Sequence, residues 1–233
     1  MPRIGGAPLL RLRLTWGLSI GTSAELIKEV VFPYPGVFDR HWQCRDGAWR
    51  NSWKCRSIGS MQAIRLSTQE YAAYGDVISA DAATEPVTAN LGFAERYNFL
   101  ATLENRRTEK AQPNLCVFRC QPMLALNEQR FEVALLERHA FSTQVFIPMN
   151  GVDKYLVIVA LGGDSPDLAT LRAFVATGSQ GITYRPGVWH HPLVAMYRPG
   201  DFVSLVWEDG SKRDCEVVKL GESVQIFAGV KSG

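Results

Sequence analysis

The chain has 233 residues, of which 46% are apolar and 21% charged, and its formal net charge is +2 at pH 7. That length accommodates one large domain, or one domain with an extension. So small a charge gives no support for a nucleic-acid-binding protein. The sequence has no apolar run of the ~18 residues that suggest a membrane span, so we expect neither nucleic acid nor a membrane as partner.

Residues 1–60 differ in character from the rest. The stretch "MPRIGGAPLLRLRLTWGLSIGTS" contains three Arg and no acidic residue, which is the bias of a mitochondrial presequence. The stretch "HWQCRDGAWRNSWKCRS" is aromatic and basic, a composition that can also bind single-stranded nucleic acid. The alternative is non-native or weakly ordered sequence upstream of a start at Met61. We therefore expect an N-terminal extension over 1–60 and a folded domain over 61–233. The location would be cytoplasmic, or mitochondrial if the extension is a presequence.

From Met61 onward the sequence becomes regular. Ser67 precedes Glu70 by three positions, a capping box that predicts a short helix ending near Gly75. Ser165 as a cap and Pro166 at the first helical position indicate one further helical turn. The remaining apolar runs are short, rich in β-branched and aromatic residues, and divided by Gly, Pro, Asn and Asp: "NLCVFRC", "FEVALLERH", "QVFIPM", "KYLVIVAL", "LRAFVAT", "ITYRP", "HHPLVAMY", "DFVSLVW" and "DCEVVKL". Such closely spaced strands predict an all-β domain, an antiparallel barrel or sandwich with a few short helices.

The chain has five cysteines. An odd number without a CxxC pair argues against both a disulfide framework and a structural zinc cluster. Cys116 and Cys120 would share one face of a strand, too far apart for a disulfide bond. We expect small core residues in a reducing compartment.

The histidines occur in a pattern. Glu137 and His139 lie two residues apart and would share a strand face, Gln144 follows, and "RPGVWH" comes about forty residues later. This layout resembles the two cupin motifs, in which two histidines and a glutamate are followed by Pro-x-Gly-x-x-His. The resemblance places Glu137 at the first histidine, His139 at the second, Gln144 at the glutamate and His190 at the last histidine. It implies a cupin-like antiparallel barrel or jelly roll.

The opposite faces of a strand separate the adjacent histidines. Successive residues of a strand point to opposite sides, so if His190 points into the barrel, His191 must point away from it. We expect His191 to pack on the outer layer or at a subunit contact, and Trp189 to face the same way or to line the rim.

The cupin resemblance also implies a metal site. Glu137, His139 and His190, with Gln144 as a weak fourth group, could hold one divalent transition metal. A usual cupin site has three histidines and one glutamate, so the glutamine removes a charge and weakens metal binding. The alternative for each residue is a hydrogen-bonded interior polar group. No organic cofactor is expected.

A narrower resemblance follows from five runs in order: "AERYNFL", "ERHAFSTQVFIPMNG", "PDLATLRAF", "GSQGITY" and "GVWHHPL". They resemble the ureidoglycolate lyase family, cupin-type enzymes of purine and allantoin breakdown, over roughly residues 61–227. The resemblance implies cleavage of (S)-ureidoglycolate into glyoxylate and urea. It also implies a homodimer, which the apolar character of both faces of "HPLVAMY" favours as well. Two alternatives stay open: a hydrolase that releases ammonia, and a non-catalytic cupin that binds a small acid.

Cleaving the substrate's C–N bond needs a base for the hydroxyl proton, an acid for the leaving nitrogen and a cation for the carboxylate. Glu137, His139, Gln144 and His190 are the candidate catalytic residues, because an imidazole suits either proton-transfer role.

The candidate substrate-binding residues are Arg119, Arg172, Tyr184 and Asn90. Arg119 lies in the apolar run "CVFRC", where a buried guanidinium would need an anionic partner. Arg172 is an arginine of the family motif, as is Arg96, for which we favour a salt bridge with an acidic residue. Tyr184 flanks the second motif. Asn90 and Gln144 could hydrogen-bond the urea amide.

Overall fold

The computed structural model describes residues 44–45, 48–49, 57–81, 85–107, 110–124 and 129–229. The chain divides into two compact units, residues 1–54 and 55–233. In the first unit, strands β1 (Cys44–Arg45) and β2 (Ala48–Trp49) pair in antiparallel fashion. The presequence-like stretch 1–23 lies outside the described residues.

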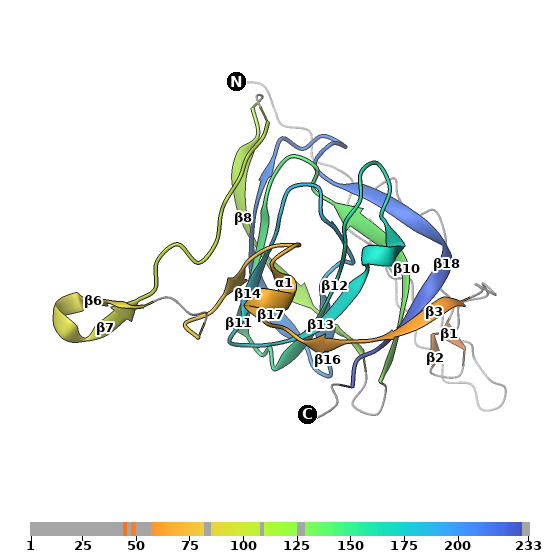
Figure 1. The fold of residues 1–233 in the computed structure, drawn as a ribbon, viewed down its shortest axis with the longest axis horizontal. Coiled ribbons are helices and arrows are strands. Elements are labelled where there is room, and N and C mark those ends of the chain that lie inside the picture. The colour runs from red at the N-terminus through yellow and green to blue at the C-terminus, as the bar shows by residue number, and fades with distance from the viewer. Residues whose placement is uncertain are drawn as a thin grey trace, which may run out of the picture. The chain divides into compact units, whose positions relative to one another are not determined.

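The second unit is built almost wholly from strands, which confirms the all-β expectation (Figure 1). The larger sheet has nine strands, with the path β3-β18-β10-β15-β12-β13-β4 and with β16 and β9 beside it. The smaller sheet has five strands in the order β5-β14-β11-β17-β8.

The bounds in the larger sheet are β3 Ser57–Gln62, β4 Ile64–Arg65, β9 Pro122–Leu124, β10 Arg130–Arg138, β12 Lys154–Ala160, β13 Arg172–Thr177, β15 Trp189–His190, β16 Val194–Met196 and β18 Glu216–Phe227. Those in the smaller sheet are β5 Val77–Ile78, β8 Gln112–Cys120, β11 Gln144–Asn150, β14 Gly181–Tyr184 and β17 Gly200–Glu208.

One short stretch closes the larger sheet on itself. Strands β3 and β4 are separated only by Ala63, yet β3 pairs with β18 at one end of the strand path and β4 pairs with β13 at the other. The Ala63 N–H between them donates to the carbonyl oxygen of Phe227 at 2.8 Å. Strand β3 begins at Ser57, so this stretch crosses the boundary that the sequence placed between residues 60 and 61.

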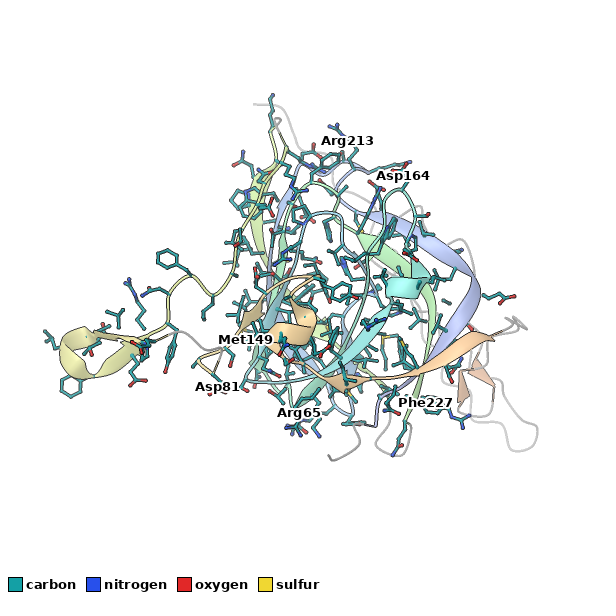
Figure 2. All side chains as sticks on the ribbon, in the orientation of Figure 1. Arg65, Asp81, Met149, Asp164, Arg213 and Phe227 are labelled. Carbon is teal, nitrogen blue, oxygen red and sulfur yellow. The ribbon has the colours of Figure 1, made fainter. Side chains whose placement is uncertain are left out.

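Both faces of the central strand β12 are buried, which explains its unbroken apolar run. Tyr155, Val157 and Val159 join side chains of the smaller sheet in a core between the two sheets. Leu156 and Ile158 belong to a second core on the opposite face of the larger sheet. The larger sheet encloses this core by closing on itself. Figure 2 shows side chains filling the space enclosed by the strands.

The short helices agree with the sequence in part. Helix α1 (Thr68–Tyr71) begins as predicted, and the Ser67 hydroxyl accepts the Glu70 N–H at 3.3 Å. The 3-10 turn η2 (Leu168–Thr170) is capped by Asp167, which accepts the Ala169 N–H at 3.0 Å, and not by Ser165 as predicted. The reason is an isolated bridge between Gly162 and Pro166, which places Ser165 in the preceding turn. Within the described ranges, no helix has the length and apolarity of a membrane span.

The run "HHPLVAMY" forms two strands and not one. Strand β15 ends at His190 and β16 begins at Val194, because Pro192 has no N–H to donate to a neighbouring strand. Both strands border β12. The two histidines and residues 194–196 are therefore buried within the chain, while Pro192, Leu193 and Tyr197 are half-buried.

A separate hairpin was not predicted. Strands β6 (Val87–Ala89) and β7 (Ala94–Arg96) pair with each other and form a sheet of their own, joined by the turn η1 (Asn90–Gly92). Figure 1 shows this hairpin apart from the two larger sheets. Leu91 is 99% exposed, so the hairpin has no apolar core of its own.

Residues 57–65, which close the larger sheet, give the first prediction. A chain that starts at Met61 lacks the Ser57, Gly59 and Ser60 positions that pair with β18. A few lost backbone pairings should lower the melting temperature by about 5 °C or more. Thermal denaturation of chains starting at Ser57 and at Met61 tests this. Equal melting temperatures would show that closure does not need the first half of β3.

Candidate functional site

Four residues stand opposite one another across neighbouring strands of the larger sheet. Glu137 on β10 pairs with His190 on β15, His190 pairs with Val159 on β12, and Val159 pairs with Arg172 on β13. Residues directly opposite in register point to the same face of a sheet. Val159 belongs to the core between the two sheets, so Glu137 and His190 also face that interior.

His139 joins Glu137 and His190 just beyond the end of β10. Its ring stacks against that of His190, with centroids 5.7 Å apart and planes inclined by 19°. Glu137 Oε1 lies 3.5 Å from His190 Nε2. One potential ligand atom from each of the three residues lies within 4.8 Å of the others. The structure thus brings together three of the four residues that the cupin motifs indicated.

Backbone carbonyl groups orient both imidazoles. His139 Nδ1 lies 2.6 Å from the carbonyl oxygen of Asp214, and His190 Nδ1 lies 3.1 Å from that of Val188. A carbonyl oxygen only accepts, so each Nδ1 carries a hydrogen, and Nε2 has a lone pair whenever the ring is neutral, as that of His139 is at pH 7. This arrangement prepares a histidine either to accept a proton or to bind a metal.

The smaller sheet supplies the facing wall. Gln144 on β11 and Tyr184 on β14 stand opposite each other, and the Tyr184 ring stacks on His190 with centroids 3.9 Å apart. Gln144 Oε1, the Tyr184 hydroxyl and His190 Nε2 are buried without a hydrogen-bond partner among the described residues; the 3.5 Å contact with Glu137 is too long to count as one. An unsatisfied buried group costs about 1–3 kcal/mol, so these three atoms favour binding of a molecule that can hydrogen-bond them.

Burial sets the charges of the site. Burial, followed by the neighbouring His190, lowers the pKa of His139 to about 4, so this imidazole is neutral at pH 7. Burial by itself raises the pKa of Glu137, but His190 and then His139 lower it, and the net shift is downward. Burial raises the pKa of Tyr184 well above its usual value, so its hydroxyl keeps its proton. The site therefore offers a carboxylate, a neutral imidazole and a phenol.

Arg119 was expected to be a buried cation, and this expectation is wrong. Its side chain is 77% exposed and forms a two-point ion pair with Asp201, with distances of 2.9 and 3.1 Å. The reason is its place on β8, the edge strand of the smaller sheet, directly opposite Asp201 on β17. The structure does not bring Arg119 to the histidines.

Asn90 is not brought to the site either. It is exposed in the turn of the β6–β7 hairpin, with φ of 49°, and Arg96 lies on the same hairpin. Arg172 is exposed and donates to the carbonyl oxygen of Leu171 at 2.8 Å. Arg172 nevertheless belongs to the row of paired residues that contains His190.

His191 and Trp189 lie on the face opposite to His190, as the alternation indicated. The His191 ring meets Phe131 edge-on at 5.0 Å. Trp189 is fully buried in the second core, where its indole N–H donates to the carbonyl oxygen of Gly163 at 3.2 Å. Both are interior residues of this chain and do not lie on an outer layer or rim.

The model of the family described as ureidoglycolate lyase matches residues 59–227. The chain belongs to the ureidoglycolate lyase family. Two ureidoglycolate lyases, from Escherichia coli (strain SMS-3-5 / SECEC) and Shigella boydii serotype 18, are each 40% identical over 171 residues, covering 72% of this chain and 99% of the relative. The family match spans Glu137, His139, Gln144, Tyr184 and His190.

Likeness to solved structures is weak. The dTDP-4-dehydrorhamnose 3,5-epimerase from Elizabethkingia anophelis aligns with a TM-score of 0.31 and 9% identity, over 46% of this chain and 55% of the other. RmlC from Streptococcus suis aligns with a TM-score of 0.31 and 14% identity, over 44% and 46%.

Sequence reasoning missed the loop that supports the site. Asp214 holds His139 through its carbonyl group, and Cys215 Sγ lies 3.7 Å from Glu137 Oε2. Asp214 lies 75 positions after His139, and Cys215 lies 78 positions after Glu137. Their local spacing carries no signal for this role.

His191 gives the second prediction. Its ring fills space against Phe131 and is 8% exposed, so His191→Ala should leave a cavity. We expect a loss of roughly 2–3 kcal/mol in the free energy of unfolding, measured by urea denaturation. His191→Phe, which refills the space, should recover most of the loss. Unchanged stability in the alanine variant would contradict the packing role.

Proposed function

We propose that this chain is a ureidoglycolate lyase that cleaves (S)-ureidoglycolate into glyoxylate and urea. The substrate carbon carries a hydroxyl, a carboxylate and a ureido nitrogen. The observation that carries the proposal is the group formed by the half-buried Glu137 and the buried His139 and His190, which faces the unsatisfied Gln144 and Tyr184 within the stretch that matches the family. The histidines and the carboxylate can transfer a proton, and Gln144 and Tyr184 can hydrogen-bond an amide.

His190 is suited to carry the proton. Its Nε2 lone pair takes the substrate hydroxyl proton, and the carboxylate of Glu137, 3.5 Å away, stabilises the imidazolium that forms. As the C–O double bond forms, the C–N bond breaks and its electron pair stays on the ureido nitrogen. The same proton then passes to that nitrogen, so glyoxylate and urea leave without a water being consumed.

The facing wall suits the ureido group. Gln144 Oε1 can accept from the urea N–H groups, and the neutral Tyr184 hydroxyl can donate to the urea carbonyl. Both atoms are buried and lack partners among the described residues, so binding urea would satisfy them.

Arg172 is the guanidinium best placed for the substrate carboxylate. It stands two strands from His190 in the same row of paired residues, a separation of about 10 Å at the usual strand spacing. A long, exposed arginine can cover much of that distance, and its planar fork matches a carboxylate. Arg172 therefore replaces Arg119 in this role.

The donor set also fits a divalent transition metal. Two imidazoles with free Nε2 lone pairs and one ionised carboxylate form a common ligand set, in which Gln144 could be a weak fourth ligand. When bound, such an ion would act as a Lewis acid toward a substrate oxygen. Holding the ion would fall to Glu137, His139 and His190.

Product analysis tests the proposed function. The purified protein is incubated with (S)-ureidoglycolate, and glyoxylate, urea and ammonia are each quantified. We expect urea and glyoxylate in equal amounts and no ammonia. Ammonia in place of urea would indicate a hydrolase, and binding of glyoxylate without any turnover would indicate a non-catalytic cupin.

The adjacent histidines provide a third prediction with a built-in control. His190→Gln should lower kcat by ~10²-fold or more, the scale expected on losing a general acid–base group. His191→Gln, on the opposite face of the strand, should leave kcat per folded molecule within about twofold. Steady-state kinetics scaled to the folded fraction measures both. The reverse ranking would exclude His190 as the proton carrier.

Removing metal gives the fourth prediction. Treatment with chelator should lower turnover, and a late first-row divalent ion should restore it. Glu137→Gln should weaken binding of the same ion in calorimetric titration. If protein shown to be metal-free by elemental analysis keeps full turnover, the three residues act by proton transfer and hydrogen bonding alone.

We further propose a homodimer, through a surface other than "HPLVAMY", whose residues are buried or half-buried within the chain. The outer face of the smaller sheet carries apolar side chains in paired rows, including Leu115 opposite Leu205 and Val203 opposite Ile147. These side chains line a hollow of about 240 Å³, and Leu115 is 71% exposed. An apolar patch of this kind on a soluble protein usually marks an interface.

The homodimer is the fifth prediction. Leu115→Glu should convert it to monomer in light scattering at micromolar concentration, because a charge at the centre of an apolar interface stays unpaired. Lys154→Glu, on an exposed position of β12, is the control for the added negative charge. A wild-type chain that is already monomeric would exclude the homodimer.

A further inference from the structure

Arg107 is a buried arginine outside the group of proton-transfer and binding residues. Its side chain is 6% exposed, and its Nη1 atom lies 2.7 Å from Asp214 Oδ1 and 3.1 Å from Asp209 Oδ2. The contacts are close ion pairs and not aligned hydrogen bonds, because Nη1 meets no acceptor in hydrogen-bond geometry. Removing one partner of such a buried pair leaves an uncompensated charge, which is strongly unfavourable.

Asp214 organises the loop between β17 and β18. Its carboxylate accepts the Asp209 N–H at 3.1 Å and the Gly210 N–H at 2.7 Å. Its own N–H donates to the carbonyl oxygen of Ser211 at 3.1 Å. The loop therefore folds around one carboxylate, and Arg107 neutralises that carboxylate from outside the loop.

The same loop supports the site at two atoms. The Asp214 carbonyl oxygen lies 2.6 Å from His139 Nδ1, and the next residue, Cys215, contacts Glu137. Arg107 also contacts Phe141, two residues after His139. The guanidinium lies 5.5 Å from the Phe141 ring centroid, and the Arg106 N–H donates to the Phe141 carbonyl oxygen at 2.7 Å. Arg107 thus contacts both segments whose separation sets the His139–Asp214 hydrogen bond.

We propose that Arg107 is a positioning residue for His139. By fixing Asp214, Arg107 holds the Asp214 carbonyl oxygen beside His139 Nδ1. This contact keeps the hydrogen on Nδ1 and leaves the Nε2 lone pair for the site. Without Arg107, Asp214 loses its cation, while Asp209 keeps Arg213, whose Nη2 lies 3.9 Å from Asp209 Oδ2. The loop then relaxes, and His139 gains access to its other tautomer and to other ring orientations.

The neighbouring arginine is a matched control. Arg106 lies on the surface with its side chain 56% exposed and pairs with Glu104 at 2.8 Å. Arg106→Gln and Arg107→Gln remove the same charge one residue apart, but only the second change reaches the loop that holds His139. Arg107→Lys keeps the charge but loses the planar fork, so it should retain part of the positioning of His139 that Arg107→Gln loses.

The decisive measurement does not depend on activity. Imidazole 15N shifts of full-length, metal-free protein report which ring nitrogen carries the hydrogen. We expect the Nδ1–H form of His139 in the wild type and in Arg106→Gln. Arg107→Gln should show a mixture with the Nε2–H form, and Arg107→Lys should lie between. Asp214→Asn, which keeps the carbonyl group and removes the ion pair, should resemble Arg107→Gln and provides a second route if that variant folds poorly.

A kinetic readout rests on the proposed lyase function. The loss of an outer residue that orients a site histidine usually costs ~10–100-fold in activity or metal affinity. We expect kcat to fall by that factor in Arg107→Gln while KM changes less than about threefold, with Arg106→Gln unaffected. His139 in the Nδ1–H form in Arg107→Gln, as in the wild type, would overturn the positioning role. Absence of turnover in the wild type would overturn the lyase function and leave the tautomer result intact.

Discussion

The site depends on one constraint: two buried imidazoles and a carboxylate that is 22% exposed lie within a few ångströms of one another. A buried charge is costly unless it is paired, and the structure meets that cost within the site. Burial raises the pKa of Glu137, but His190 above all lowers it below its usual value. Burial lowers the pKa of His139 to about 4, so this imidazole is neutral at pH 7. Each imidazole donates from Nδ1 to a backbone carbonyl oxygen, which fixes the orientation of both rings.

The wall opposite these residues is the smaller sheet, and the closure of the larger sheet covers the other face of the strands that carry them. Residues 57–65 bond to both ends of its strand path, which allows strands such as β12 to be apolar on both faces. One face packs against the smaller sheet and carries the row from Glu137 to Arg172, while the other holds Trp189 and His191 in a second core. The adjacent histidines therefore lie in different environments, His190 beside Glu137 and His191 against Phe131.

Some features followed from the sequence because their causes are local. The Ser67 cap depends on residues three positions apart, and the side to which His190 and His191 point depends only on strand alternation. The spacing of Glu137, His139 and His190 resembled cupin motifs, and the structure brings these residues together. The prediction for Arg119 was wrong because an apolar run does not reveal whether its strand lies at the edge of a sheet. Ser165 lost the cap to Asp167 because a bridge from Gly162 occupies that turn.

The sequence by itself determined the all-β class, the family and the residue types that meet in the site, since strand periodicity and motif spacing are properties of short segments. Only the tertiary structure decided which partners complete the site. The carbonyl group that orients His139 lies 75 positions away, and its loop is neutralised by Arg107 from another segment. Such contacts leave no trace in local spacing, because they arise when strands distant in sequence are paired and the loops at their ends meet.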